Sequence, residues 1–219
     1  MKKNGNKELV TGGLLLLAFC VWTAMIQLVD VQPIGQNGTL VGFAALNRWF
    51  HEKTGVHMAV YTVTDWLGLV PVFICMVFGG VGLAQWIKRR SLWKVDKDFL
   101  FLGIYYVLVI FGYLIFEMIP INYRPILING FMEASYPSST TLLVLSVMPT
   151  LSFQVKRRVG HAAVKKAVSI FVILFSAFMV LGRTVAGVHW LTDIIGSVLL
   201  SAGIFDIYKA IVLRYCNEV

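Results

Sequence analysis

One short segment near the C-terminus combines an arginine, a histidine and an aspartate at a defined spacing. Five residues separate Arg183 from His189, and three more separate His189 from Asp193. A separation of four residues predicts that His189 and Asp193 project from one face of a helix. The carboxylate can then accept a hydrogen bond from one imidazole nitrogen, which leaves the other free as a nucleophile. The segment therefore indicates nucleophilic chemistry.

Two earlier segments carry side chains of the kind that bind phosphate. They are residues 122–125, with the sequence NYRP, and residues 136–141, with the sequence YPSSTT. Two guanidiniums, from Arg124 and Arg183, and helix N-terminal amides near one imidazole would form a receptor for phosphate, whose oxygens accept paired hydrogen bonds. The three segments together predict phosphoryl chemistry.

The composition predicts that membrane-spanning helices position these segments. Of the 219 residues, 58% are hydrophobic and 14% are charged, which is more apolar than a soluble domain of this length. A spanning helix needs roughly 20 residues, so the chain has room for about six spans and for no separate soluble domain. The apolar runs that predict these spans are 9–29, 58–87, 99–120, 138–155, 167–182 and 189–213.

The basic residues are divided unequally between the two sides that six spans would create. Both termini would lie on one side. That side would also hold most of the 19 Lys and Arg residues, and the other side would hold only Arg48, Lys53, Arg124 and Arg183. The positive-inside rule places that side in the cytoplasm and the phosphate-binding segments outside. The net charge of +8 falls in short blocks between apolar runs. This distribution of charge indicates which ends of the helices lie in the cytoplasm, and no nucleic-acid partner is expected.

The motif formed by Arg183, His189 and Asp193 resembles the last motif of the type 2 phosphatidic acid phosphatase (PAP2) superfamily. Arg124-Pro125 and Pro137-Ser138 match parts of its first two motifs in the same order. The resemblance implies an all-α, polytopic membrane protein with a six-transmembrane-helix bundle in a single domain, 1–219. Within it, 31–57 would form an outside loop with an interfacial helix near 41–50, more a structural lid than a binding site. Loops 121–137 and 183–189 would form the active site.

The same resemblance implies a role for each matched residue. His189 would attack phosphorus and carry a phosphohistidine, while Asp193 orients the imidazole and stabilises its charge. No metal and no cofactor are expected, and the partners would be a lipid phosphate substrate and membrane lipids. The phosphate-binding groups would be Arg124, Ser138, Ser139, Thr140 and Arg183.

The sequence departs from the family pattern at two positions. Glu117 stands where the first motif has a lysine, and Thr140 stands where the second motif ends in a histidine. That histidine is the family's general acid, and such help is typically worth about 10² to 10⁴ in rate. Slow turnover of simple phosphate esters is therefore expected, whereas a diphosphate leaving group needs little protonation. His51 and His57 are candidates for the missing acid, although ordinary interfacial histidines are the favoured reading.

The predicted function is a membrane lipid phosphatase that acts on a lipid phosphate or an isoprenoid diphosphate, such as undecaprenyl diphosphate, at the outer leaflet. Two alternatives remain open. One is a catalytically weakened protein that binds lipid phosphate headgroups, and the other is an anion or lipid transporter. Asp65 and Asp206 lie in apolar runs near the ends of predicted helices, where both can reach water, and neither is assigned a role.

Overall fold

The computed structural model describes residues 2–216, with side chains from residue 5 onward. The regular secondary structure of these residues is helical, with no named strand. The predicted all-α class is therefore confirmed. Two short 3₁₀ turns, Gln36–Gly38 and Leu92–Lys94, lie between helices. The α-helices are α1 Lys2–Leu28, α2 Ala44–Thr54, α3 Met58–Leu67, α4 Leu69–Arg89, α5 Lys97–Met118, α6 Ser139–Arg158, α7 Ala162–Val185 and α8 Leu191–Tyr215.

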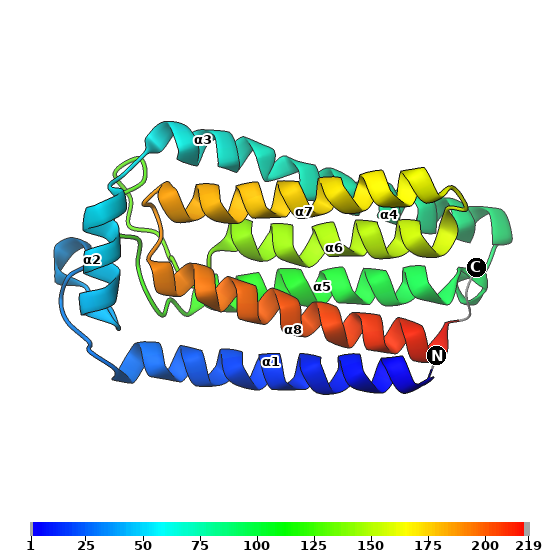
Figure 1. The fold of residues 1–219 in the computed structure, drawn as a ribbon, viewed down its shortest axis with the longest axis horizontal. Helices are drawn as coiled ribbons and strands as arrows, with labels where there is room; N and C mark the ends of the chain where they lie inside the picture. Colours follow the sequence, from blue (N-terminus) through cyan, green and yellow to red (C-terminus); the bar gives the residue numbers. More distant parts are fainter. Residues whose placement is uncertain (1, 217–219) are drawn as a thin grey trace.

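The long helices lie side by side along the long axis of the molecule, and α2 lies across one end of them (Figure 1). Helix α6 packs against α4, α5, α7 and α8 and therefore occupies the middle of the bundle. Helix α1 begins and α8 ends at the end of the bundle opposite α2. The loops that follow α5 and α7 lie at the α2 end, which is where the candidate site forms.

Five segments of the described chain are long and apolar enough to cross a membrane: Gly5–Leu28, Met58–Arg89, Lys97–Met118, Ala162–Val185 and Leu191–Tyr215. The predicted sixth span, α6, is not among them. Its buried polar side chains include Thr150, which bonds the Tyr106 hydroxyl at 2.7 Å, and Gln154, which donates to the Tyr208 hydroxyl at 2.8 Å. A helix surrounded by other helices can carry such groups because neighbouring helices satisfy them. The count of six spans stays a prediction.

The second apolar run, predicted as one helix, is divided at Gly68 into α3 and α4. Pro71 explains the interruption, because proline has no N–H to donate to the carbonyl of Leu67, four residues earlier. The Gly68 amide instead lies near two carbonyls, at 3.1 Å from Thr64 and 3.0 Å from Asp65. The break lies beside the N-terminal turn of α6 and so forms part of the surroundings of the site.

Close packing of α1 on α8 depends on small residues at their contact. A Cβ atom at Gly12 would lie 2.9 Å from the carbonyl oxygen of Gly203, and one at Gly203 would lie 2.8 Å from the Leu16 side chain. Small residues allow helix backbones to approach in a membrane, where lipid provides no hydrophobic drive between helices. Helix α1 is thereby fixed along the helix that carries Asp193.

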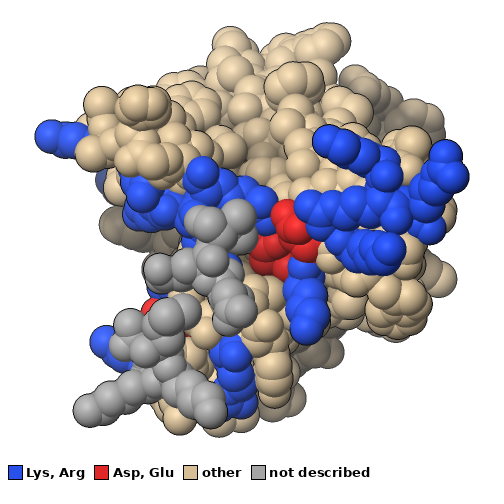
Figure 2. All heavy atoms as spheres, turned by 90° about the vertical axis from the view of Figure 1, so that its right-hand side faces the viewer, with Lys and Arg blue, Asp and Glu red and all other residues tan. Residues whose placement is uncertain are grey.

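The two ends of the bundle differ in charge. Figure 2 looks onto the end opposite α2, where Lys and Arg side chains surround a smaller acidic patch. Asp98 is buried at this end of the bundle, and both of its carboxylate oxygens accept from Arg158 at 2.7 Å. The four basic residues predicted for the other side lie on α2, in the loop after α5 and at the end of α7: Arg48, Lys53, Arg124 and Arg183.

Candidate active site

His189 lies in the connection between α7 and α8, just before the first residue of α8, Leu191. Trp190 caps the helix, and its backbone N–H donates to Asp193 Oδ2 at 2.9 Å. The prediction that His189 and Asp193 share one helical face is therefore wrong, because His189 precedes the helix. Asp193 is used as the capping side chain of the first turn, and Gly187, with φ of +70°, turns the chain just before His189.

The His189 imidazole is buried and held at both nitrogens. Its Nδ1 lies 3.1 Å from the carbonyl oxygen of Ser135 and 3.1 Å from the Ser135 hydroxyl. A proton on Nδ1 donated to that carbonyl leaves Nε2 with its lone pair, as a nucleophile requires. Nε2 lies 3.3 Å from Nη2 of Arg183, so the nitrogen faces a cationic donor.

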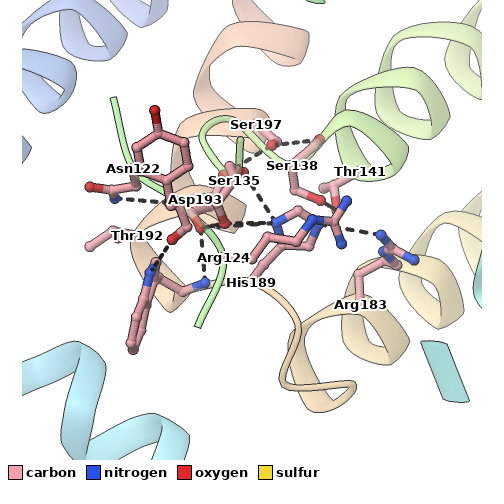
Figure 3. Close-up of polar contacts among 12 residues, drawn as sticks. Asn122, Arg124, Ser135, Ser138, Thr141, Arg183, His189, Thr192, Asp193 and Ser197 are labelled. Atoms are coloured by element: carbon pink, nitrogen blue, oxygen red, sulfur yellow. Dashed lines mark hydrogen bonds and ion pairs between the residues drawn. The ribbon is translucent and has the colours of Figure 1, made fainter. Parts of the chain in front are cut away.

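Asp193 approaches His189 but makes no direct hydrogen bond with it, because Oδ2 lies 3.9 Å from Nδ1. Ser135 stands between them and donates its hydroxyl to Asp193 Oδ2. The carboxylate is fully buried and also accepts from Asn122 Nδ2 at 3.2 Å and from the Trp190 amide. These donors offset the cost of removing a carboxylate from water. The expected contact between Asp193 and His189 therefore runs through Ser135 (Figure 3).

Arg124 and Arg183 are the two buried guanidiniums of the site. Both lie over the Tyr61 ring, with Cζ at 5.9 Å and 4.9 Å from its centroid. Arg124 pairs with Glu133 at 3.1 Å, and Arg183 lies 3.7 Å from Asp65. Within residues 5–216, Nη1 of each guanidinium makes no hydrogen bond. Buried donors without partners are costly in a protein, and here they offer a polyatomic anion two sets of N–H groups.

The charge around His189 favours its neutral form. Burial lowers the pKa of the imidazole well below its usual value, and the positive charges of Arg124 and Arg183 lower it further. Both effects disfavour the protonated ring. The imidazole is therefore neutral at pH 7 and can act as a nucleophile.

The N-terminal turn of α6 joins the site through Ser138, which is buried and caps the helix. Its hydroxyl donates to Thr141 Oγ1 at 3.1 Å, and its carbonyl accepts from the Ser197 hydroxyl at 3.0 Å. Its amide lies 3.4 Å from the carbonyl oxygen of Asp193. These bonds place the positive end of the α6 dipole beside the first turn of α8, in the region of Arg124 and His189 (Figure 3).

Two hollows lie near Ser139, and Thr140 lines only the second of them. Ser139 faces a mainly polar cavity of about 200 Å³ whose wall also includes Arg124, Glu117 and Glu133. Thr140 lines a mainly apolar hollow of about 280 Å³, which Ser139 also borders, at the break between α3 and α4. The structure thus brings Ser139 together with Arg124, whereas Thr140 lies toward Asp65.

The two histidines considered as replacement acids are bonded to the backbone. His51 Nε2 lies 3.1 Å from the carbonyl oxygen of Gly187, and His57 Nε2 lies 2.8 Å from that of Thr54. The amide of His57 also donates to the Ala186 carbonyl at 3.0 Å. These contacts fasten the junction of α2 and α3 to the loop that carries His189, which agrees with the favoured reading of both residues.

Helix α2 is also clamped directly to the start of α8. The buried Asn47 side chain donates to Thr192 Oγ1 at 3.0 Å and to the Gly42 carbonyl at 2.8 Å. Its Oδ1 accepts from the Thr192 amide at 3.3 Å. The helix predicted over 41–50 thus exists as Ala44–Thr54 and is fixed across the end of the bundle that carries His189.

Four residues of the site were not identified from the sequence: Asn122, Ser135, Glu133 and Asp65. Asn122 lies in the same short segment as Arg124, and this proximity was an available signal. Ser135 offered none, because a single serine matches no motif. Its backbone carbonyl accepts from His189, which any residue could do, and only the structure shows its hydroxyl donating to Asp193. Glu133 is visible only through its ion pair with Arg124. Asp65 was noticed as a carboxylate in an apolar run, but its place beside Arg183 is known only from the structure.

Comparison with known proteins defines the protein family of the chain. A family model described as the PAP2 superfamily matches residues 104–214, which is half of the chain, and the chain therefore belongs to that superfamily. The match covers all three motifs, so the predicted resemblance to PAP2 membrane lipid phosphatases is confirmed. No curated protein sequence matches significantly.

A solved structure extends the likeness to almost the whole chain. It is the crystal structure of the first transmembrane PAP2 type phosphatidylglycerolphosphate phosphatase from Bacillus subtilis. The two folds agree with a TM-score of 0.67 over 95% of this chain and 99% of that chain, at 17% sequence identity. An identity this low establishes the fold alone. The chain is accordingly a multi-pass membrane protein with the PAP2 fold.

Proposed function

We propose that the protein is a lipid phosphatase that hydrolyses a lipid phosphate or an isoprenoid diphosphate through a phosphohistidine at His189. The observation that carries the proposal is the environment of the imidazole. Nδ1 is held by the Ser135 carbonyl at 3.1 Å, and Nε2 faces Arg183 at 3.3 Å. A buried, neutral imidazole with one nitrogen fixed and the other beside a guanidinium suits attack on phosphorus.

In the first proposed step, Nε2 of His189 attacks phosphorus and the bond from phosphorus to the leaving oxygen breaks. Arg124 and Arg183 bind the equatorial oxygens, and the amides at the start of α6 complete the cradle with Ser138. The imidazole becomes cationic as the P–N bond forms. Its Nδ1–H then donates more strongly to Ser135, whose hydroxyl connects the charge to Asp193. In the second step water attacks phosphorus, and His189 leaves as neutral imidazole.

The need to protonate the leaving group distinguishes simple phosphate esters from diphosphates. A threonine hydroxyl at position 140 cannot protonate a leaving alkoxide at neutral pH, whereas a leaving phosphate needs little protonation. Asp65 lines the same hollow as Thr140 and lies 3.7 Å from Arg183. We assign to Asp65 the role of base for the water in the second step. This division of labour favours a lipid diphosphate over a simple phosphate ester.

The site is proposed to face outward. The support is the charge distribution, since basic residues concentrate at the end of the bundle where α1 begins and α8 ends, and the candidate site lies at the other end (Figures 1 and 2). A substrate would then be hydrolysed at the outer leaflet. Labelling of a single cysteine placed at Lys53 in intact cells by a membrane-impermeant maleimide tests the orientation, and labelling only after permeabilisation would contradict it.

Phosphate release from purified protein tests the activity. The panel contains undecaprenyl diphosphate, phosphatidic acid and phosphatidylglycerolphosphate, each with wild type, His189→Ala and Asp65→Asn. We expect the highest rate on the diphosphate, no release by His189→Ala, and a build-up of phosphoenzyme in Asp65→Asn. Faster release from phosphatidic acid would refute the preference for diphosphate.

Binding and flux measurements beside this panel separate the two alternatives. Binding of lipid phosphate without release by wild type would identify a headgroup-binding protein. The changes at Glu117 and Thr140 are the evidence for that reading. Flux of lipid or anion through protein in vesicles, without hydrolysis, would identify a transporter.

A further inference from the structure

A large groove lies at the end of the bundle away from His189, between α6, α7 and α8. Its volume is about 1140 Å³, several times that of either hollow near the candidate site. Helix α6 packs against both neighbours, whereas α7 and α8 diverge from their short connection at the His189 end toward the basic end (Figure 1). The divergence leaves α6 as the floor of the groove.

The walls of the groove are mainly apolar. Val172 and Ile173 contribute from α7, and Phe205 and Leu213 contribute from α8. Lipid contact explains an apolar outer face on any spanning helix, but here the apolar surface is concave and large enough for part of an acyl chain. Its floor is closed by a hydrogen bond of 3.0 Å between Ser152 of α6 and Ser169 of α7.

The rim of the groove is cationic and lies at the membrane-surface end of the helices. Its cations are Lys156, Arg157, Arg158, Lys165 and Lys209, and no carboxylate of a described residue lines it. Arg158 pairs with Asp96 and Asp98. Lys209 pairs with Glu8 at 2.8 Å. Lys156 and Lys165 make no ion pair with any described residue. The rim therefore keeps a net positive charge directly beside the apolar trough.

We propose that this groove binds a membrane phospholipid with an anionic headgroup, held at the basic end of the bundle. The phosphate would lie among the rim cations, and an acyl chain would occupy the trough between α7 and α8. A soluble anion would use only the rim, and a zwitterionic lipid would gain less from its charge. A lipid anion complements both surfaces. The site is at the opposite end of the bundle from His189 and independent of the proposed hydrolysis.

Native mass spectrometry of the full-length protein tests the proposal, with phosphatidylglycerol and phosphatidylcholine as the added lipids. We expect preferential retention of phosphatidylglycerol by wild type and by His189→Ala. The double variant Lys156→Gln/Lys165→Gln should retain it roughly 25-fold less, since each surface cation contributes about a fivefold factor. Ile173→Trp, which fills the trough and keeps every charge, should weaken retention as well.

The matched control is Lys88→Gln/Arg90→Gln, which removes two cations from the end of α4, away from the groove. It should retain phosphatidylglycerol like wild type. Equal losses in both double variants would show that only the general basic surface attracts the lipid and would overturn the proposal. Equal retention of the two lipids by wild type would overturn it too. Loss of retention in His189→Ala would assign the binding to the other end of the molecule.

Discussion

The Ser135 hydroxyl is the connection between His189 and Asp193, and its removal tests the proposed arrangement of the site. Ser135→Ala deletes the donor to Asp193 Oδ2 and the hydroxyl 3.1 Å from His189 Nδ1. It leaves the backbone carbonyl that fixes the ring. The substitution should therefore separate stabilisation of the imidazolium charge from orientation of the imidazole.

The expected magnitude follows from the bonds that are lost. A hydrogen bond to a charged group contributes about 1.5–3 kcal/mol, and about 1.4 kcal/mol corresponds to a factor of ten in rate. Asp193 would keep its bonds from Asn122 and from the Trp190 amide. We expect kcat to fall by roughly 10- to 100-fold. KM should change little, because Ser135 is placed behind the imidazole.

Phosphate release measured with a lipid diphosphate at several concentrations gives kcat and KM separately, and thermal unfolding reports the fold. Ser152→Ala is the matched control, since it deletes a part-buried hydroxyl that bonds Ser169 between α6 and α7. It should leave kcat unchanged. A Ser135→Ala protein with normal unfolding and wild-type kcat would refute the connection through Ser135, and a rise in KM alone would indicate a role in binding.

Three further results are expected. Gly187→Ala should lower the free energy of unfolding by about 1–3 kcal/mol. The cause is that φ is +70° and the new Cβ would lie 2.0 Å from the Gly55 carbonyl oxygen. Unchanged thermal unfolding would contradict this expectation. Thr140→His should raise phosphate release from phosphatidic acid if position 140 lies beside the leaving group, and an unchanged rate would count against that placement. Because the pKa of His189 is lowered in the folded state, only the unfolded state gains this proton just below about pH 6.5. Thermal unfolding of wild type should therefore lose stability relative to His189→Gln as pH falls below that value, and a constant difference would contradict the lowered pKa.

Spacing in the sequence singled out Arg183, His189 and Asp193, and the structure brings these residues together near Arg124 and Ser138 (Figure 3). It misplaced the start of α8, because an acidic residue four positions after a histidine fits both a shared helical face and a capping position. The structure selects the capping position, with Asp193 accepting from Trp190. The residues of this motif were thus predictable from the sequence, whereas the residue at which α8 begins was not.

The fold was predictable where composition decides it. Apolar runs identified the long helices, including α6 as the run 138–155. Helix α6 carries polar side chains that its neighbours satisfy, so it is not among the five segments of the described chain that are apolar enough to cross a membrane. Pro71 was a readable signal for the break at Gly68. The groove between α7 and α8 had no sequence signal, since it depends on how far two helices diverge.

Trapping the phosphorylated enzyme tests the central claim most directly. Rapid acid-free quenching during turnover of a lipid diphosphate, followed by peptide mass spectrometry, should find one phosphoryl group on His189, and more of it in Asp65→Asn. The label should be lost in acid and stable in base, as expected of a P–N bond. Turnover with no phosphoryl group on His189, or sustained phosphate release by His189→Ala, would contradict the account.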